Sequence, residues 1–468
     1  MLYHFGVPGF GGGFVGVDVF FVISGFLMTG IVVRGLERGG SPWLFVGSFY
    51  MARARRILPA LIVLCAVLLI LGWWVLMPLD YKMLGNHAVY SLTFLSNIKF
   101  WREAGYFDTA SHEKWLLHTW SLAVEWQFYL LLPLALLAVW KLRPGRKSII
   151  TAMIVGLLVS LALSVVATPL QPTAAFFLLP TRAWEMLAGG LVFLLVPRIV
   201  LSSWQRATLE AAGLTLIIGA AIGFDTSSAW PGWRALVPVL GTVTVLLAAR
   251  PESLWTGSAV AQWLGTRSYS IYLWHWPLVV ALTYLEWQVK PAAIAAGLGL
   301  TMVLGHLSYR WVENPARKQM VKRRLMWGAA ALLGGAVAVA VPGAGIRWKE
   351  GVAGRFPASV EQVANEGNNK KPRHAECFAK GGTESPSCMY GGTRLRAILI
   401  GDSHADAITT ALAAAVPSAM DGIMDWTYIS CPTARGVKNL GPGFGPKEKC
   451  GEFLEWAFKK LDGVPSDV

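Results

Sequence analysis

Long apolar runs recur along the first three quarters of the chain and end near residue 345. Each run is close to the roughly 20 residues that a helix needs to cross a hydrocarbon layer about 30 Å thick. The rest of the chain mixes polar and short apolar stretches. The pattern predicts a polytopic all-α membrane domain of about ten spans and then a separate domain. The spans are expected at 14–34, 57–77, 119–140, 148–168, 176–197, 207–225, 234–249, 268–287, 291–311 and 325–341.

Basic residues gather in alternate loops between these spans. If the loop after the first span is cytoplasmic, all of these basic loops are cytoplasmic, as the positive-inside rule requires. The polar C-terminal domain then lies outside the membrane. The basic loop residues are Arg34, Arg53, Arg55, Arg56, Lys141, Arg143, Arg146, Lys147, Arg198, Arg206, Arg250, Arg267, Arg317, Lys318, Lys322, Arg323 and Arg324.

The composition supports this topology. Hydrophobic residues make up 54% of the 468 residues and charged residues only 15%, too apolar for a series of ordinary soluble domains. The net charge is +14, but the residues from 347 onward hold 15 Lys and Arg against 14 Asp and Glu. The basic charge therefore belongs to the membrane part and predicts no nucleic-acid partner.

Four of the five cysteines lie in the expected extracytoplasmic domain, and only Cys65 lies in a span. Such usage is typical of an oxidising compartment. Four cysteines allow three pairings, of which Cys377 with Cys388 and Cys431 with Cys450 closes the shortest loops. Four free thiols are the alternative.

Three ionisable residues near the predicted outer face are candidates for proton transfer. His4 precedes a glycine-rich bend, and Asp18 lies at the start of the next span. A carboxylate beside an imidazole fixes its tautomer, as a general base acting on a hydroxyl requires. Glu125 lies six residues into its span, about 9 Å below the surface, within reach of the same space. The alternatives are a frayed terminal His4, a helix-capping Asp18, and a structural Glu125 paired with an arginine such as Arg182.

Other polar residues in the apolar runs are expected to be structural or to line a channel. Arg182 and Glu185 are one helical turn apart and can partly neutralise each other. His118 lies beside the span that holds Glu125, and His275 lies among aromatic residues. Packing with a hydrogen-bonded imidazole is the alternative for His275.

Two further motifs could bind or react with a substrate. Arg53 and Arg56 stand at the mouth of a span, where guanidinium groups can hold the phosphates of a nucleotide-like donor or, alternatively, only set topology. Ser403 follows an apolar strand in Gly-Asp-Ser-His, at a helix N-terminus whose N–H groups can stabilise an oxyanion. A simple helix cap is the alternative for this turn.

Taken together, these segments resemble the acyltransferase-3 family of bacterial membrane O-acyltransferases, in particular members with a C-terminal SGNH-type domain. The resemblance covers nearly the whole chain. It rests on His4 with the run 13–27, Arg53-x-x-Arg56, Gly-Tyr-Phe-Asp at 105–108, the run 118–129, Arg182-Ala-Trp-Glu185, the run 269–277 and Glu313-Asn-Pro-Ala-Arg317.

The resemblance implies transfer of an acyl group, usually acetyl, from cytoplasmic acetyl-CoA to hydroxyls of a surface glycan such as lipopolysaccharide, peptidoglycan or exopolysaccharide. It implies His4 as catalytic histidine, Arg53 and Arg56 as donor-binding residues and Ser403 as SGNH nucleophile, with no metal. The protein would lie in the bacterial inner membrane with its C-terminal domain periplasmic. The expected parts are a transmembrane acyltransferase domain at 1–345, a linker at 346–390 and a partial α/β SGNH-like domain at 391–468.

Three departures from the family pattern stand out. An arginine about three turns before His4 would fall before Met1, so the first helix is expected to be missing. Trp126 replaces a second glutamate, and the chain ends before an Asp-x-x-His motif. We therefore expect a chain truncated at both ends.

Two other functions fit parts of the sequence. A membrane-tethered glycan esterase would rest on Ser403 alone. A transporter would use the intramembrane carboxylates to bind substrate or protons, although no internal repeat is visible.

Overall fold

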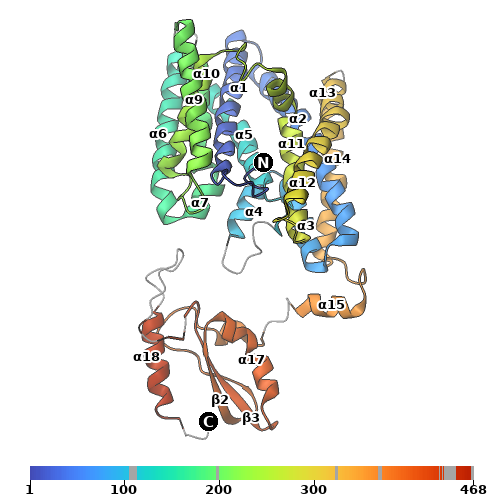
Figure 1. Cartoon of the computed structure of the whole chain (residues 1–468), viewed down its shortest axis with the longest axis vertical. Helices are drawn as coiled ribbons and strands as arrows, with labels where there is room; N and C mark the ends of the chain where they lie inside the picture. The colour runs from blue at the N-terminus through green and yellow to red at the C-terminus, as the bar shows by residue number, and fades with distance from the viewer. Residues whose placement is uncertain are drawn as a thin grey trace. The chain divides into compact units, whose positions relative to one another are not determined.

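A computed structural model describes residues 1–104, 113–196, 200–321, 325–366, 371–431, 433–434, 436 and 449–464. The chain forms two compact units, Met1–Phe356 and Pro357–Val468, which we call the helical unit and the C-terminal unit (Figure 1). The motif at 105–108 lies outside the described residues.

The helical unit is built almost entirely of α-helices (Figure 1). They are α1 (Gly16–Arg38), α2 (Pro42–Val75), α3 (Pro78–Leu92), α4 (Ser96–Arg102), α5 (Thr119–Leu142), α6 (Arg146–Leu170), α7 (Pro172–Phe177), α8 (Ala183–Leu195), α9 (Ser203–Gly223), α10 (Leu236–Ala248), α11 (Ala259–Tyr284), α12 (Pro291–Ser308), α13 (Asn314–Val321) and α14 (Leu325–Trp348). Short turns of 3₁₀-helix are η1 (Gly13–Val15), η3 (Leu179–Thr181) and η5 (Gly232–Ala235), and η6 (Tyr309–Glu313) is a π-helical turn.

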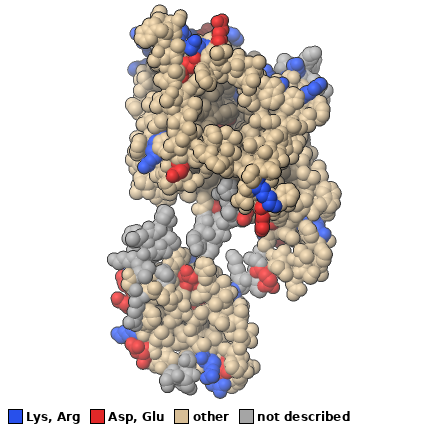
Figure 2. Space-filling view, viewed as in Figure 1, with Lys and Arg blue, Asp and Glu red and all other residues tan. Residues whose placement is uncertain are grey.

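Seven helical stretches among the described residues are long and apolar enough to cross a membrane, which confirms a multi-pass architecture. The expected span 176–197 is broken into α7, η3 and α8, and α8 is a shorter apolar helix. Helix α11 has 26 residues but is not among the seven, because residues such as Arg267 and His275 lower its hydropathy. In Figure 2, charged residues gather toward the ends of this unit, and the middle of the viewed face is uncharged.

Helices α1 and α8 pack backbone to backbone. A Cβ added to Gly25 would lie 1.8 Å from the Met186 carbonyl oxygen, and one added to Gly189 would lie 1.8 Å from the Val22 carbonyl oxygen. Small residues permit such close approach in membranes, where apolar lipid leaves little other force to hold helices together. The interface between α1 and α8 therefore fixes the position of both helices.

The C-terminal unit contains a three-stranded sheet of order β1-β3-β2 (Figure 1). Strand β1 (Cys388–Gly391) is antiparallel to β3 (Asp421–Thr427), and β3 is parallel to β2 (Arg394–Gly401). The helices are α15 (Ala358–Asn365), α16 (His374–Cys377), α17 (Ser403–Ala415) and α18 (Cys450–Leu461). A small α/β domain is confirmed.

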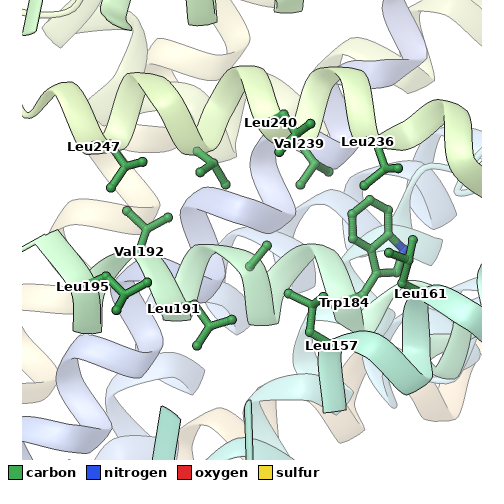
Figure 3. Close-up of a pocket in the computed structure, with 12 residues that line it drawn as sticks. Leu157, Leu161, Trp184, Leu191, Val192, Leu195, Leu236, Val239, Leu240 and Leu247 are labelled. Carbon is green, nitrogen blue, oxygen red and sulfur yellow. The ribbon is translucent and has the colours of Figure 1, made fainter. Parts of the chain in front are cut away.

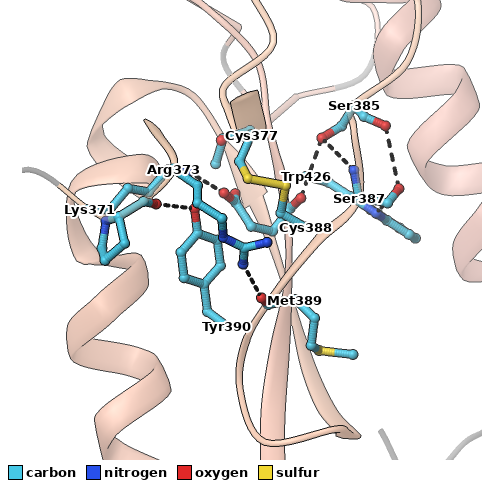
Figure 4. Close-up of a disulfide and its surroundings, with 12 residues drawn as sticks. Lys371, Arg373, Cys377, Ser385, Ser387, Cys388, Met389, Tyr390 and Trp426 are labelled. Atoms are coloured by element: carbon cyan, nitrogen blue, oxygen red, sulfur yellow. Dashed lines mark hydrogen bonds and ion pairs between the residues drawn. A yellow bond between two sulfur atoms is a disulfide. The ribbon is translucent and has the colours of Figure 1, made fainter. Parts of the chain in front are cut away.

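Two disulfides tie this unit together. Cys377 bonds Cys388, and Cys431 bonds Cys450, the pairing that closes the shortest loops. Around the first bond, Arg373 donates to the Met389 carbonyl oxygen at 2.6 Å (Figure 4). Residues 371–390 were expected in the linker, but the disulfide and strand β1 make them part of the domain.

A buried ion cluster joins the same segment to the sheet. The Lys371 ammonium group donates to Asp425 on β3 and pairs with Asp406 on α17. The second oxygen of Asp406 lies 2.8 Å from Nδ1 of His374. Burial opposes the charged ammonium, but the hydrogen bonds to the two carboxylates prevail and raise the pKa of Lys371.

We expect Gly25→Ala to destabilise the helical unit by about 1–3 kcal/mol or more, because the added methyl group would overlap the Met186 carbonyl. The measurement is thermal unfolding of the purified chain in detergent. Gly299→Ala on α12 is the matched control, since a Cβ there meets open space. Equal melting temperatures for the two variants would contradict the close contact.

We expect Lys371→Met to destabilise the C-terminal unit by about 3–5 kcal/mol, because two buried carboxylates lose their cation. Since the folded pKa of Lys371 is raised, its stabilisation is complete below the ordinary lysine pKa and is lost as pH rises through the raised value. Pulse proteolysis of the full chain from neutral to alkaline pH measures both effects. The variant should lack the alkaline loss, whereas Lys380→Met at an exposed position should retain it.

Candidate active site

A short N-terminal segment carries His4 into the helical unit. Phe5 is buried against α12, where a Cβ added to Gly297 would lie 2.6 Å from the Phe5 ring. Further along, the Gly12 N–H donates to the Ala221 carbonyl oxygen of α9 at 2.9 Å. Helices distant in sequence therefore hold the segment on both sides of His4.

His4 lies against α11. Its Nδ1 is 2.9 Å from Nε2 of His275, and the two imidazole rings stack with centroids 5.1 Å apart. Nδ1 of His275 lies 2.5 Å from the Tyr272 carbonyl oxygen, one helical turn earlier. Trp276 also contacts His4, at 5.0 Å between ring centroids. His275, expected to line a channel or to pack as a hydrogen-bonded imidazole among aromatic residues, is thus the hydrogen-bond partner of the candidate base.

His118 adds a third imidazole to this cluster. Its ring centroid lies 5.8 Å from that of His275 and 5.3 Å from that of Tyr272. The Tyr272 hydroxyl donates to the His118 carbonyl oxygen and lies 2.7 Å from the Ser121 hydroxyl. Neither ring nitrogen of His118 has a hydrogen-bond partner of ordinary geometry among the described residues.

These contacts place the start of α5 deep in the helical unit. His275 is nine residues from Tyr284, the last residue of α11, which is about 13 Å at 1.5 Å per residue. His118 lies at this level, and Glu125 is two turns further into α5. The depth of about 9 Å below the membrane surface that was expected for Glu125 stays a prediction; the structure shows that its side chain is buried.

Glu125 is held by hydroxyl groups. Ser24 of α1 and Tyr129, one turn further along α5, both donate to Oε1 of Glu125, and their own hydroxyls are 2.5 Å apart. All three side chains are buried. The alternative of a pair with Arg182 is not formed. An aqueous proton or substrate would reach Glu125 only through the interior of the unit.

Arg53 and Arg56 lie one turn apart on α2, close enough that their positive charges act on the Glu125 carboxyl group. The charge of Arg56 also acts on Glu313, which accepts a hydrogen bond from Ser270 at 2.8 Å. The buried Nε of Arg53 has no hydrogen-bond partner among the described residues. Guanidinium donors of this kind suit phosphate oxygens.

The expected pair of Asp18 with His4 is not formed. Oδ1 of Asp18 accepts from Arg182 at 3.0 Å, and its Oδ2 has no hydrogen-bond partner among the described residues. Arg182 also pairs with Glu185 at 2.9 Å, as the spacing predicts. Asp18 faces α8, where a fully buried guanidinium group is a stronger partner for a carboxylate than a neutral imidazole. Phe21 and Trp120 lie 5.4 and 5.7 Å from this guanidinium group.

A cavity adjoins the candidate base among the described residues. It has a volume of about 350 Å³ and is lined by Tyr3, His4, Phe5, Gly6, Thr226, Val279, Leu282, Thr283 and Gln288. A second, of about 290 Å³, lies between α6, α8 and α10, and its walls consist of leucine, valine, alanine and tryptophan side chains (Figure 3). Of these two cavities, the first is lined by the titratable side chains of Tyr3 and His4, and the second by apolar side chains.

Ser403 is the first residue of α17 and follows β2 directly. Asp402 caps the helix, because its Oδ1 accepts from the His404 N–H at 2.9 Å. The Ser403 side chain is partly exposed at the carboxyl end of a parallel strand, where α/β sheets place their sites. The His404 ring faces Asp402 at 3.2 Å and not the serine.

Three hydroxyl groups of the site, those of Ser24, Tyr129 and Tyr272, were not predicted from the sequence. Tyr129 carried a usable signal, because it lies four residues after Glu125 and hence on the same helical face. Ser24 and Tyr272 carried none, since hydroxyl groups are common in spans and their partners are more than 100 residues away in the sequence.

We expect Arg182→Met to destabilise the helical unit by about 3–5 kcal/mol, because Asp18 and Glu185 would remain buried without their cation. Adding Asp18→Asn and Glu185→Gln should restore much of that loss by removing both charges. Melting temperatures in detergent compare the variants. An Arg182→Met protein as stable as the parent would contradict a structural role for the cluster.

Comparisons with known proteins match both units. A family model described as an acyltransferase domain matches residues 1–310, and one described as an SGNH domain fused to AT3 domains matches residues 373–468. No solved structure matches the chain.

Curated relatives match the membrane part. Peptidoglycan O-acetyltransferase OatA of Listeria monocytogenes is 31% identical over 333 residues, 68% of this chain and 53% of the relative. O-acetyltransferase OatA of Staphylococcus aureus is 29% identical over 341 residues, 69% and 55% of the two chains. BcsY of Komagataeibacter xylinus, whose name proposes a membrane-bound transacylase, is 34% identical over 314 residues, 65% and 76% of the two chains.

The chain spans about half the length of the two OatA relatives. Its own match to the acyltransferase model nevertheless covers well over half of its residues and includes every candidate residue of the helical unit. The resemblance seen in the sequence is confirmed: the chain belongs to the acyltransferase-3 family of membrane acyltransferases and carries a C-terminal SGNH domain.

Proposed function

We propose that this protein is a membrane O-acyltransferase that moves an acyl group, most simply acetyl, from cytoplasmic acyl-CoA to hydroxyl groups of a cell-surface glycan. It would lie in the bacterial inner membrane with its C-terminal unit on the periplasmic side. The names of the OatA relatives favour peptidoglycan as the acceptor. Lipopolysaccharide or exopolysaccharide would present the same hydroxyl chemistry.

The observation that carries this proposal is the short distance between the candidate donor and acceptor groups. The Tyr269 hydroxyl donates to the carbonyl oxygen of Ile57, the residue after Arg56, at 2.7 Å. Two turns further along α11, His275 contacts His4. The six residues from Tyr269 to His275 rise about 9 Å along the helix. An acyl donor bound at the arginines and an acceptor hydroxyl at His4 would therefore be separated by only a short stretch of the apolar interior.

The donor end fits a phosphorylated cofactor by its chemistry. Arg53 and Arg56 bring two guanidinium groups to one helical face, and the Nε of Arg53 has no hydrogen-bond partner among the described residues. Buried carboxylates at Glu125 and Glu313 limit the excess positive charge. The arginines would hold the phosphates by charge-assisted hydrogen bonds, which fixes the thioester end toward the interior.

The acceptor end fits a general base beside a cavity. His4 would take the proton of an attacking hydroxyl as its oxygen bonds to the acyl carbon and the thioester carbon–sulfur bond breaks. That proton then passes to the departing thiolate, so charge and atoms balance. Asp18 takes no part in this step, since its carboxylate is committed to Arg182.

Ser403 would serve a second stage in the C-terminal unit. Its hydroxyl would attack the acyl ester formed in the first stage and release the hydroxyl that carried the acyl group, and a sugar hydroxyl would then attack the serine ester and release the serine. The N–H groups at the start of α17 would stabilise the oxyanion in both steps.

We expect His4→Ala to lower acyl transfer by about 10²–10⁴-fold, because the general base is lost. We expect Arg53→Gln with Arg56→Gln to raise the KM for acetyl-CoA roughly tenfold or more, because charge-assisted hydrogen bonds to phosphate disappear. Proteoliposomes supplied with labelled acetyl-CoA on the arginine side and peptidoglycan fragments on the other side measure both constants. Mass spectrometry identifies the product.

Arg146→Gln is the matched control, because Arg146 pairs with Glu37 at an exposed position of the helical unit. It should leave both constants unchanged. Full transfer by His4→Ala would overturn the role of His4. Glycan acetylation that increases when the gene is deleted would instead indicate an esterase.

A further inference from the structure

We infer that His275 is a positioning residue that holds His4 in the tautomer with its proton on Nδ1 and its lone pair on Nε2. The inference deepens the proposed function, since it says how the base is prepared. The evidence is the order of hydrogen-bond donors and acceptors in two successive contacts, from Tyr272 to His275 and from His275 to His4.

The assignment of hydrogen-bond donors and acceptors starts at a backbone carbonyl oxygen. The Tyr272 carbonyl oxygen can only accept a hydrogen bond, so Nδ1 of His275, 2.5 Å away, must carry a proton. A neutral imidazole holds one proton, so Nε2 of His275 is then an acceptor. Nδ1 of His4, 2.9 Å from that acceptor, must therefore donate, and in the neutral ring that a general base requires Nε2 of His4 is unprotonated.

The argument requires a neutral His275, and its surroundings supply the reason. The residue is 2% exposed and packs among the rings of His4, His118, Tyr272 and Trp276. No carboxylate among the described residues is hydrogen-bonded to it. A buried cation without a counter-charge is costly, so the neutral ring is favoured.

The fold holds this orienting group rigidly. His275 and Tyr272 lie one turn apart on α11, so their contact is set by the helix itself. Tyr272 is fixed in turn by the His118 carbonyl oxygen and the Ser121 hydroxyl of α5. Trp276 donates through Nε1 to the Lys114 carbonyl oxygen at 2.8 Å, which anchors the next turn. The acceptor offered to His4 therefore has a fixed direction.

An imidazole here takes the place of the carboxylate that commonly orients a catalytic histidine. A neutral acceptor selects the tautomer without adding a negative charge to the low-dielectric interior. When His4 takes up a proton at Nε2, its Nδ1–H keeps the same hydrogen bond to His275. The proton gained and later released is the one on Nε2.

The test is ¹⁵N NMR of the full chain in detergent, with labelled histidine and without substrate. The His4 resonance is assigned by its loss in His4→Ala. In the parent protein, Nε2 of His4 should show the shift of an unprotonated nitrogen. A protonated Nε2 in the parent spectrum overturns the inference by itself, even if a variant at position 275 fails to fold.

Two variants at position 275 separate positioning from packing. His275→Gln keeps an acceptor, because the amide oxygen can replace Nε2; the tautomer should persist and kcat should stay within a few-fold of the parent. His275→Leu removes the acceptor; His4 should become a mixture of tautomers and kcat should fall by about 100-fold or more. His306→Gln, on a histidine that accepts from Arg267 at 2.9 Å, is the control and should change neither.

Two results would contradict the role: an unchanged His4 spectrum in His275→Leu, or an equal loss of kcat in the Gln and Leu variants. Because the spectra need no substrate, a parent protein that transfers no acyl group would contradict the proposed function and leave the tautomer assignment to be judged on its own.

Discussion

The arrangement of buried polar side chains in the helical unit is governed by the free-energy cost of leaving a polar group without a hydrogen-bond partner away from water. In an apolar helical bundle each buried hydroxyl, carboxyl or imidazole needs a partner. On α11, Ser270 donates to the Glu313 carboxyl group, and His275, five residues further along, contacts His4. The same rule holds Asp18 and Glu185 on Arg182, outside this series. Pairing thus divides the buried ionisable groups into a structural set around Arg182 and a candidate reactive set around His4.

Segments far apart in the sequence supply the reactive set, and this limits what a sequence can reveal. The apolar runs predict most spans, because length and hydropathy act locally. They do not reveal that the start of α5 packs beside the turn of α11 that holds His275, since that neighbour is set by tertiary packing. For that reason the contacts of His118 with Tyr272 and His275 were not predicted.

Partner choice shows the same limit. Arg182 with Glu185 was predictable because the two residues share a helix turn. His4 and His275 are 271 positions apart in the sequence, so no local sequence pattern predicts their contact. Asp18 was assigned to the histidine nearest in sequence, whereas the buried interface between α1 and α8 supplied a guanidinium group. In the C-terminal unit the shortest-loop disulfides were predictable, but the Lys371 cluster, which draws on three segments, was not.

Helix α11 connects the two ends of the site as one stiff element. Its turn at Tyr269 is bonded to the backbone beside the arginines, and its turn at His275 orients the candidate base. A rod of this kind cannot shift or rotate at one contact while the other stays in place. A displacement of the helix beside Arg56 would therefore also change the direction in which His275 presents its nitrogen to His4.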